Sequence, residues 1–285
     1  MEVLPIWYVQ VTGVQRVTPR MARISFGGKE LAGLSRIEPD QQVKLYFPKP
    51  GQERPRLPKP DGDFLGWYQA FNAIPEDERP WTRSYTIRAH HPERSTVDVD
   101  FVLHHDAGPA TRWAWSAKPG DTLGMFGPST TFARPVPLRT SIEAADRLLL
   151  MGDETAIPAI GSLIESLPRG TRAVAYIEIA DSGEEQAFET CGEVTVHWLP
   201  RDGVPAGHSD VLVKALQDAE FPSGSVFAWL AAESGTVRAL RRHLVDERGV
   251  AKRSIEFTGH WRLKLTQDDA PTPEDLAEAQ ERFGS

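Results

Sequence analysis

Alternating hydrophobic and polar residues predict a series of short strands in the first half of the chain. Turn residues separate these runs, as expected for consecutive strands of an antiparallel sheet. The predicted strands are 9–11, 21–26, 42–47, 84–87, 97–104 and 122–126. One helical pattern, beginning at Pro109, lies between the last two strands. Six strands with this spacing predict a small closed antiparallel β-barrel.

In the second half, apolar strand runs alternate with helical patterns. The predicted strands are 147–151, 173–179, 194–199, 226–230 and 254–257, and the predicted helices are 155–167, 211–219 and 235–247. Ser209 and Ser234 stand where helix N-caps are expected. Such alternation predicts an α/β domain in which helices cover a parallel sheet.

These patterns predict two domains, at 1–134 and 146–264, followed by a C-terminal helical tail at 265–285. Prolines mark a linker around 132–145, and Thr272 and Pro273 suit the start of the tail helix. Between two barrel strands, 48–80 is a long proline-rich insertion. A loop of this length is either a functional lid or a disordered span, and the sequence leaves both open.

Composition narrows the class of protein. The chain has 285 residues, no apolar run long enough to span a membrane, and a single cysteine, Cys191. The N-terminus lacks the pattern of a secretion signal, so a cytoplasmic location is expected. The net charge of −8 argues against nucleic acid as a partner.

Two neighbouring strands carry residues suited to a flavin nucleotide. Arg83 and Tyr85 lie two positions apart on one strand face, where they can hold an anion and stack a flat ring. The strand that includes Asp100 ends at Gly108-Pro109, which begins a helix whose free amides form a phosphate site. The two features together indicate FAD.

Five segments in this order resemble the siderophore-interacting protein family, flavin-dependent ferric-siderophore reductases similar in architecture to ferredoxin–NADP reductase. The segments are 83–86, 100–110, 152–159, 229–233 and 259–262, and the resemblance extends from about Val9 to Lys264. It implies that FAD carries the chemistry, so no catalytic side chain is expected, and that Thr86 lies near the flavin ring. The residues implied to bind the cofactor are Arg83, Ser84, Tyr85, Thr86, Asp100, Phe101, Val102, His104, Gly108, Pro109, Ala110, Trp113, Thr155, Ala232 and Glu233.

The resemblance also implies a substrate and an electron donor. The substrate is a ferric siderophore, and the donor is NADH, NADPH or ferredoxin. Lys44 and Lys264 stand at the family's basic substrate-binding positions, and Arg248 is a third candidate. The family usually has Gly at the position of Lys264. Two alternatives stay open: a general NAD(P)H:flavin or quinone reductase, and a flavoprotein that binds ferric siderophores without reducing them.

Two further patterns bear on ligands. The turn Gly152-Asp153-Glu154-Thr155 lacks the G-x-G-x-x-G fingerprint, and its two carboxylates are expected to repel a pyrophosphate and weaken nicotinamide binding. The pairs His90-His91 and His104-His105 flank one predicted hairpin. They lack Cys or carboxylate partners at ligand spacing, so no protein metal site is expected.

Overall fold

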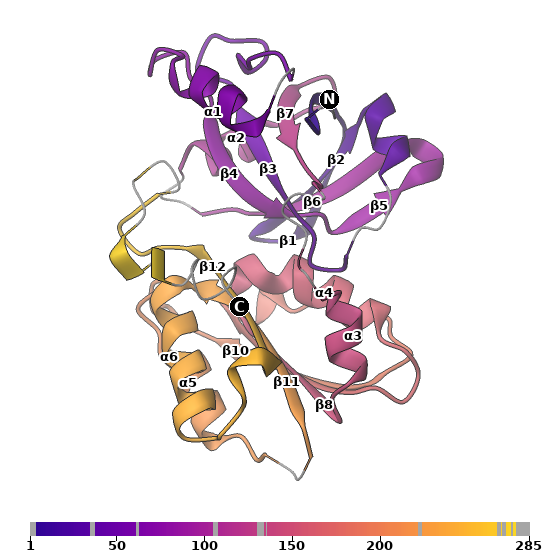
Figure 1. Cartoon of the computed structure of the whole chain (residues 1–285), viewed down its shortest axis with the longest axis vertical. Coiled ribbons are helices and arrows are strands. Elements are labelled where there is room, and N and C mark those ends of the chain that lie inside the picture. Colours follow the sequence, from indigo (N-terminus) through magenta and orange to yellow (C-terminus); the bar gives the residue numbers. More distant parts are fainter. Residues whose placement is uncertain are drawn as a thin grey trace.

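The computed structural model describes residues 4–34, 38–60, 63–104, 108–129, 134, 136–221, 224–266, 269, 272–274 and 276–277. It contains an antiparallel sheet from the first half of the chain and a parallel sheet from the second half, one above the other in Figure 1. The two-domain fold class is therefore confirmed. No described helix is long and apolar enough to cross a membrane.

The first sheet has seven strands within the described residues, in the order β4-β3-β7-β1-β2-β6-β5. They are β1 (Ile6–Thr18), β2 (Met21–Gly27), β3 (Gln42–Phe47), β4 (Trp81–Thr86), β5 (Ala89–His91), β6 (Thr96–Val102) and β7 (Thr122–Phe126). All six predicted strands are present, and the three-residue β5 is the addition. The sheet surrounds an aromatic core in which Phe26, Phe47 and Phe101 are fully buried.

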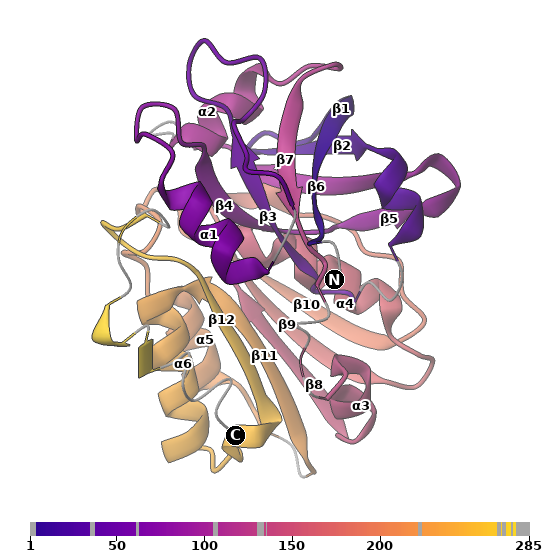
Figure 2. The ribbon, with the colours of Figure 1, turned by 45° about the horizontal axis from the view of Figure 1, so that its top comes forward.

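Helix α2 (Pro109–Ser116) begins at the predicted residue, and Trp113 packs against the aromatic core. The insertion at 48–80 contains a second helix, α1 (Phe64–Asn72), which the sequence analysis missed. Trp67 and Phe71 of α1 pack against Tyr46 and Phe126 of the sheet. Figure 2 shows α1 beside the antiparallel sheet. This part of the insertion is therefore a packed helix and not an irregular loop.

The second sheet is parallel, with strand order β10-β9-β8-β11-β12. Its strands are β8 (Arg147–Gly152), β9 (Arg172–Ile179), β10 (Glu193–Pro200), β11 (Val226–Glu233) and β12 (Ile255–Trp261). Leu148 and Leu150 of β8 face α3 (Leu138–Glu143) and α4 (Ile157–Ser166). Leu149 and Met151 face α5 (Val211–Asp218) and α6 (Ser234–Asp246) on the opposite side.

Some predicted details of this domain were wrong. Helix α3 lies where a linker was expected, and β11 and β12 extend to Glu233 and Trp261. The cap of α6 is Glu233, whose carboxylate accepts hydrogen bonds from the first-turn N–H groups of Gly235 and Thr236. In the described part of the predicted tail, the Leu276 N–H donates to the Thr272 carbonyl at 3.0 Å, and the remainder lies outside the described residues.

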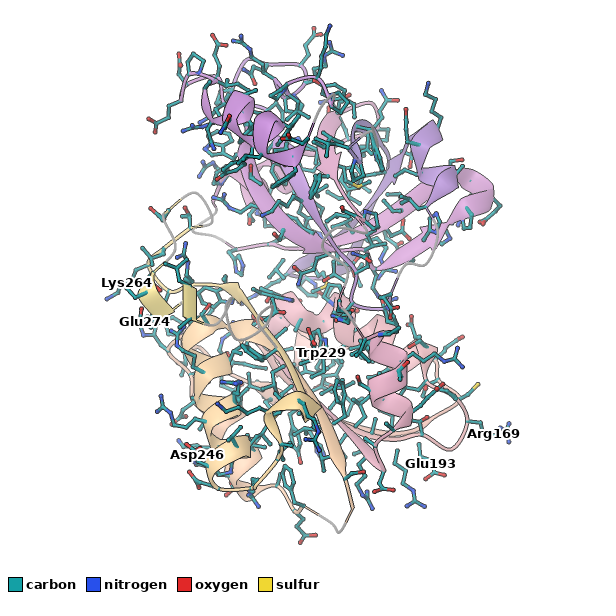
Figure 3. All side chains as sticks on the ribbon, in the orientation of Figure 1. Arg169, Glu193, Trp229, Asp246, Lys264 and Glu274 are labelled. Atoms are coloured by element: carbon teal, nitrogen blue, oxygen red, sulfur yellow. The ribbon has the colours of Figure 1, made fainter. Side chains whose placement is uncertain are left out.

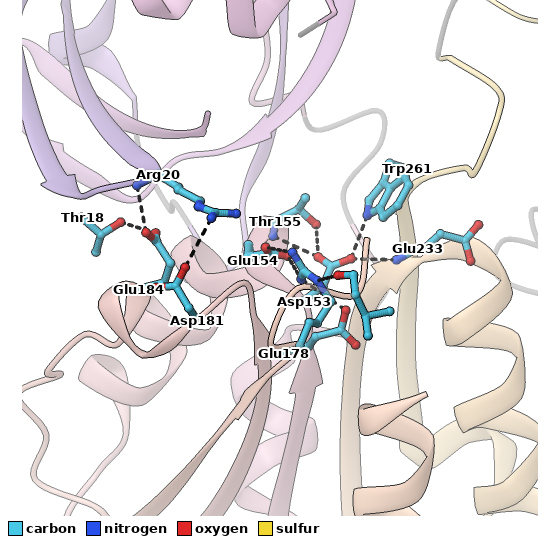
Figure 4. Close-up of polar contacts among 12 residues, drawn as sticks. Thr18, Arg20, Asp153, Glu154, Thr155, Glu178, Asp181, Glu184, Glu233 and Trp261 are labelled. Carbon is cyan, nitrogen blue, oxygen red and sulfur yellow. Dashed lines mark hydrogen bonds and ion pairs between the residues drawn. The ribbon is translucent and has the colours of Figure 1, made fainter. Parts of the chain in front are cut away.

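Ion pairs and hydrogen bonds join the two domains. The Asp40 carboxylate accepts hydrogen bonds from both terminal nitrogens of Arg134 at 2.9 and 2.8 Å. It also accepts one from the Trp229 indole N–H at 2.9 Å. Arg88 forms a two-bond pair with Glu165 of α4. Glu184 accepts the backbone N–H of Arg20 and the Thr18 hydroxyl (Figure 4). These contacts hold the domains in one relative orientation.

Candidate functional site

A cleft of about 630 Å³ lies between the domains. The antiparallel sheet and α2 contribute Gln42, Lys44, Arg83, Ser84, Tyr85, Thr86, Asp100, Val102, His104, Gly108 and Thr111. The second domain and the segment after β12 contribute Thr155, Pro158, Ser234, Phe257, Thr258, Gly259, His260, Trp261, Arg262, Leu265, Thr266 and Asp269. The cleft therefore lies at the carboxyl ends of β11 and β12, the usual place for ligands of such sheets.

Strand β4 forms one wall of this cleft. It pairs with β3 in a register that places Ser84 opposite Lys44 and Tyr85 opposite Val43. The Tyr85 ring is held 4.4 Å from that of Phe101, centroid to centroid. A terminal nitrogen of Arg83 donates to the Thr82 carbonyl at 2.7 Å. The strand thus presents a guanidinium, two hydroxyls and a fixed aromatic ring along one side of the cleft.

The start of α2 opens into the same cleft. Gly108 is the N-cap and supplies no side-chain acceptor, and Pro109 follows it. The first-turn N–H groups of Ala110 and Thr111 consequently have no helical acceptor, as at any helix start. Added to the helix dipole, they make a position suited to phosphate.

Several residues implied to contact the cofactor lie outside the cleft lining. Phe101, Ala110 and Ala232 are buried in the hydrophobic cores, and Trp113 packs on Phe101 at 5.9 Å. Glu233 uses its carboxylate to cap α6. Asp100 does reach the cleft, but its carboxylate is bound by Arg23 at 2.7 and 2.8 Å. Apart from Asp100, these residues do not line the cleft themselves.

The structure separates the three basic substrate candidates. Lys44 lines the cleft. Lys264 lies in the turn after β12 (Figure 3), beside lining residues but not among them. Its φ of 67° lies in the left-handed region, which glycine adopts without strain.

Arg248, the third predicted substrate residue, is not among the residues that line the cleft. Its guanidinium donates to the Leu216 and Gln217 carbonyls of α5 at 3.2 and 2.6 Å and stacks over Phe221. Besides Arg83, the cleft lining contains Arg262, which was not among the predicted substrate residues. His260 and Trp261 also line the cleft and were not among the predicted site residues. His260, Trp261 and Arg262 all lie beyond residue 257, the predicted end of the last strand, although the family resemblance includes the segment 259–262.

Contrary to expectation, the two carboxylates of the acidic turn after β8 are not among the residues that line the cleft. Glu154 is 6 % exposed and binds Arg201 through two bonds of 2.6 and 2.5 Å. Glu178 also contacts Arg201, at 3.3 Å. Glu154 is therefore buried and ion-paired, and it does not present an unpaired charge to a pyrophosphate. Weak nicotinamide binding stays a prediction.

Burial shifts the pKa of the acids beneath the cleft. It raises the pKa of Asp153 to about 6, and the neighbouring Glu154 adds to the effect. Burial likewise raises the pKa of Glu178 to about 7, against the opposing influence of Arg201. Both carboxyls therefore exchange protons near neutral pH.

The histidines of the predicted hairpin have separate partners. His90 contacts the Leu31 carbonyl at 3.0 Å, His91 contacts the Asp98 carboxylate at 3.0 Å, and His104 lies on the cleft. His105 lies outside the described residues. The described part of the chain contains no group of three side chains able to hold a metal ion.

Comparison with known proteins connects this geometry to a family. Residues 10–132 match the model of the siderophore-interacting FAD-binding domain, and residues 145–264 match that of the siderophore-interacting protein. A siderophore utilization protein from T. fusca is 36% identical, with a TM-score of 0.79, and the alignment covers 94% of this chain and 97% of that one.

A curated relative and a more distant structure add to this. The ferric vibriobactin reductase ViuB from Vibrio cholerae is 29% identical over 248 residues, 86% of this chain and 85% of that protein. A ferredoxin NADP+ reductase from Neisseria gonorrhoeae is 15% identical with a TM-score of 0.58 over 90% of this chain and 99% of that one. The second likeness shows the fold alone and confirms the predicted ferredoxin–NADP reductase-like architecture.

Proposed function

Because the chain belongs to the siderophore-interacting protein family, we propose that it is an FAD-dependent ferric-siderophore reductase. The observation that supports this proposal best is the composition of the cleft. One wall carries the groups suited to a flavin nucleotide, and the same cleft also presents Lys44, Arg262 and Trp261. Cations beside an aromatic ring suit an anionic chelate that contains aromatic groups.

The described residues fit FAD. Within the described residues, no side chain at the N-cap of α2 occupies its first-turn N–H groups, which can bind the pyrophosphate. Arg83 on β4 offers a charged partner. Tyr85, Ser84 and Thr86 would hold the ring system along β4, with Thr86 donating to it. When bound, FAD would be the redox carrier that passes electrons to the ferric ion one at a time.

The protein's own part is binding, orientation and exclusion of water. Lys44 and Arg262 attract the ferric chelate, and Trp261 limits how it can lie in the cleft. Ferrous ion then leaves the chelate because hard oxygen ligands hold it less firmly than ferric ion. The proposed electron donor is NADH or NADPH docking near Thr155, with ferredoxin as the alternative. We place the reaction in the cytoplasm, which suits the exposed free Cys191.

The decisive test is a half-reaction without any donor. Protein photoreduced under anaerobic conditions is mixed with a ferric catecholate, and flavin absorbance is followed while a chromogenic chelator traps Fe(II). We expect reoxidation of the flavin together with release of Fe(II). Flavin that is reoxidised by a neutral quinone but not by the chelate would make the protein a general reductase. A chelate that binds without reoxidising the flavin would make it a binding protein.

Lys44→Ala tests the acceptor side of the proposal. We expect the KM for an anionic ferric chelate to rise by about threefold to tenfold, because a partly desolvated charge contact is lost. The kcat should change less, and added salt should weaken the unmodified protein more than the variant. Lys118→Ala is the matched control, since Lys118 is 75% exposed and pairs with Asp121. A KM that is equal in all three proteins would move the acceptor away from Lys44.

A further inference from the structure

The Asp153 carboxylate is the centre of a hydrogen-bond network beneath the cleft. Asp153 follows β8 and is only 4% exposed. Its Oδ1 accepts the backbone N–H of Thr155 at 2.9 Å and the Thr155 hydroxyl at 2.5 Å. Its Oδ2 accepts the Glu233 N–H at 3.0 Å and the Trp261 indole N–H at 2.7 Å (Figure 4). These four bonds use the full accepting capacity of a carboxylate.

Two branches of this network reach the cleft lining. Trp261 is bound directly, and His260 is bound through Thr155. The His260 Nδ1 lies 3.2 Å from both the hydroxyl and the carbonyl oxygen of Thr155. Because a carbonyl can only accept, Nδ1 carries the hydrogen. Asp153 therefore fixes the orientation of two neighbouring side chains on β12 from a single buried point.

The surroundings of Asp153 make this arrangement specific. Arg201 binds both Glu154 and Glu178, so the bonds that Asp153 accepts come from neutral N–H and O–H groups. On another side, the Trp261 ring packs against Gly207, where a Cβ would come within 2.8 Å of the ring. The indole is thus held by a hydrogen bond at its nitrogen and by backbone contact at its six-membered ring.

We propose that Asp153 is a positioning residue for the electron acceptor, acting through the Trp261 indole N–H. The bond from Asp153 fixes the plane of Trp261, and that plane forms the aromatic wall on which a ring of an anionic ferric chelate packs. Asp153 does not touch the chelate itself. This inference rests on the proposed function, because it takes the acceptor to be a chelate bound in the cleft.

Without the carboxylate, the wall loses its fixed geometry. In Asp153→Asn, the amide can present its oxygen to only one of the two donor pairs, and its NH₂ group faces the other pair. In Trp261→Phe, the ring is retained but the indole N–H that Asp153 binds is removed. Trp261→Phe removes the bond between the two residues, and Asp153→Asn removes the negative charge that strengthens it. Both substitutions should therefore loosen the same wall.

The experiment measures binding of a gallium(III) catecholate, a redox-inert stand-in for the ferric chelate, to the FAD-loaded protein by titration calorimetry. We expect Asp153→Asn and Trp261→Phe each to weaken binding by about tenfold, as for one lost hydrogen bond to a charged group. The double variant should be no weaker than the weaker single variant. In steady state, the KM for the ferric chelate should rise while the kcat stays within about threefold.

The outcomes separate the inference from the function on which it rests. Additive losses in the double variant would show that Asp153 does not act through Trp261, and would overturn the inference. Unchanged binding in Trp261→Phe would overturn it too, and this variant keeps the test valid if Asp153→Asn fails to fold. Failure of the unmodified protein to bind the gallium chelate would instead contradict the proposed function, and the inference with it.

Discussion

At the scale of single residues, the turn after β12 shows how one backbone angle limits the choice of side chain. Lys264 has a φ of 67°, in the left-handed region that costs a residue with a Cβ roughly 1 kcal/mol. Arg262 and Leu265 form a bridge on either side of it. The turn directs Arg262 and Leu265, both of which line the cleft, so its geometry matters to the site.

We expect Lys264→Gly to raise the free energy of unfolding by about 0.5–1 kcal/mol, because glycine adopts this φ without strain. Lys264→Val should lower it, since a β-branched residue tolerates this region poorly. The measurement is chemical denaturation of the apoprotein. Lys214→Gly is the matched control: Lys214 lies inside α5, where the same exchange should destabilise by about 1 kcal/mol. Destabilisation by Lys264→Gly would contradict the argument.

At the scale of secondary structure, the start of α2 is the position that we propose for the pyrophosphate of FAD. A helix with Gly at its N-cap gives up about a few tenths of a kcal/mol of the stability that Asp or Asn would supply. Gly108 has an ordinary extended backbone, with φ −63° and ψ 175°, and a Cβ there would meet nothing within 4 Å. A capping side chain would therefore fit, and its absence leaves the first-turn N–H groups to a ligand.

Gly108→Asp should keep or raise the stability of the apoprotein and weaken FAD binding by about tenfold or more, because it places a negative charge beside the pyrophosphate. Gly108→Asn occupies the same N–H groups without the charge and should weaken binding less. Gly108→Ala should change FAD affinity little. Fluorescence titration of apoprotein with FAD measures all three. Unaltered affinity in the Asp variant would place the pyrophosphate elsewhere.

At the scale of the whole molecule, the buried acids below the cleft link stability to pH. The pKa of Glu178 rises to about 7 and that of Asp153 to about 6, above their ordinary values of 4.5 and 3.8. The folded state therefore holds more protons than the unfolded state between these values. Their contribution to stability is complete below about pH 4 and is lost as the pH rises through 6 to 7.

Burial lowers the pKa of His104, which acts in the opposite direction between these pH values. Because two acids oppose this one histidine, the melting temperature of the apoprotein should be higher at pH 5.5 than at pH 8. Glu178→Gln, which removes one of the two groups, should narrow this difference by about 2–4 °C. Differential scanning calorimetry at the two pH values gives the comparison. Glu193→Gln is the control, because the Glu193 side chain is 66% exposed and should behave as the unmodified protein does. An equal pH response in all three proteins would show that Glu178 is charged throughout.

The sequence by itself determined the order and type of most elements. Strand and helix periodicities are local, so the six predicted strands of the first domain and the alternation of strands and helices in the second could be read directly. The strand that contains Arg83 to Thr86 and the start of α2 at Gly108 could be predicted in the same way, because each signal lies within a few residues. The short elements β5 and α3 were missed, since three and six residues carry too little periodicity. Helix α1 was not predicted because it lies in the insertion 48–80, where the many prolines favour an irregular loop.

Only the tertiary structure decided what the charged and aromatic side chains do. Glu154 looked like a surface acid until Arg201, 47 positions away, was found to bind it in the interior. Arg248 was predicted to bind substrate, but its guanidinium donates hydrogen bonds to two backbone carbonyls of α5. Trp261 gained its place through Asp153, 108 positions earlier in the chain. The reason is physical: the fate of a charge or an indole N–H depends on which partner folding brings within 3 Å, and local pattern carries no record of that distance.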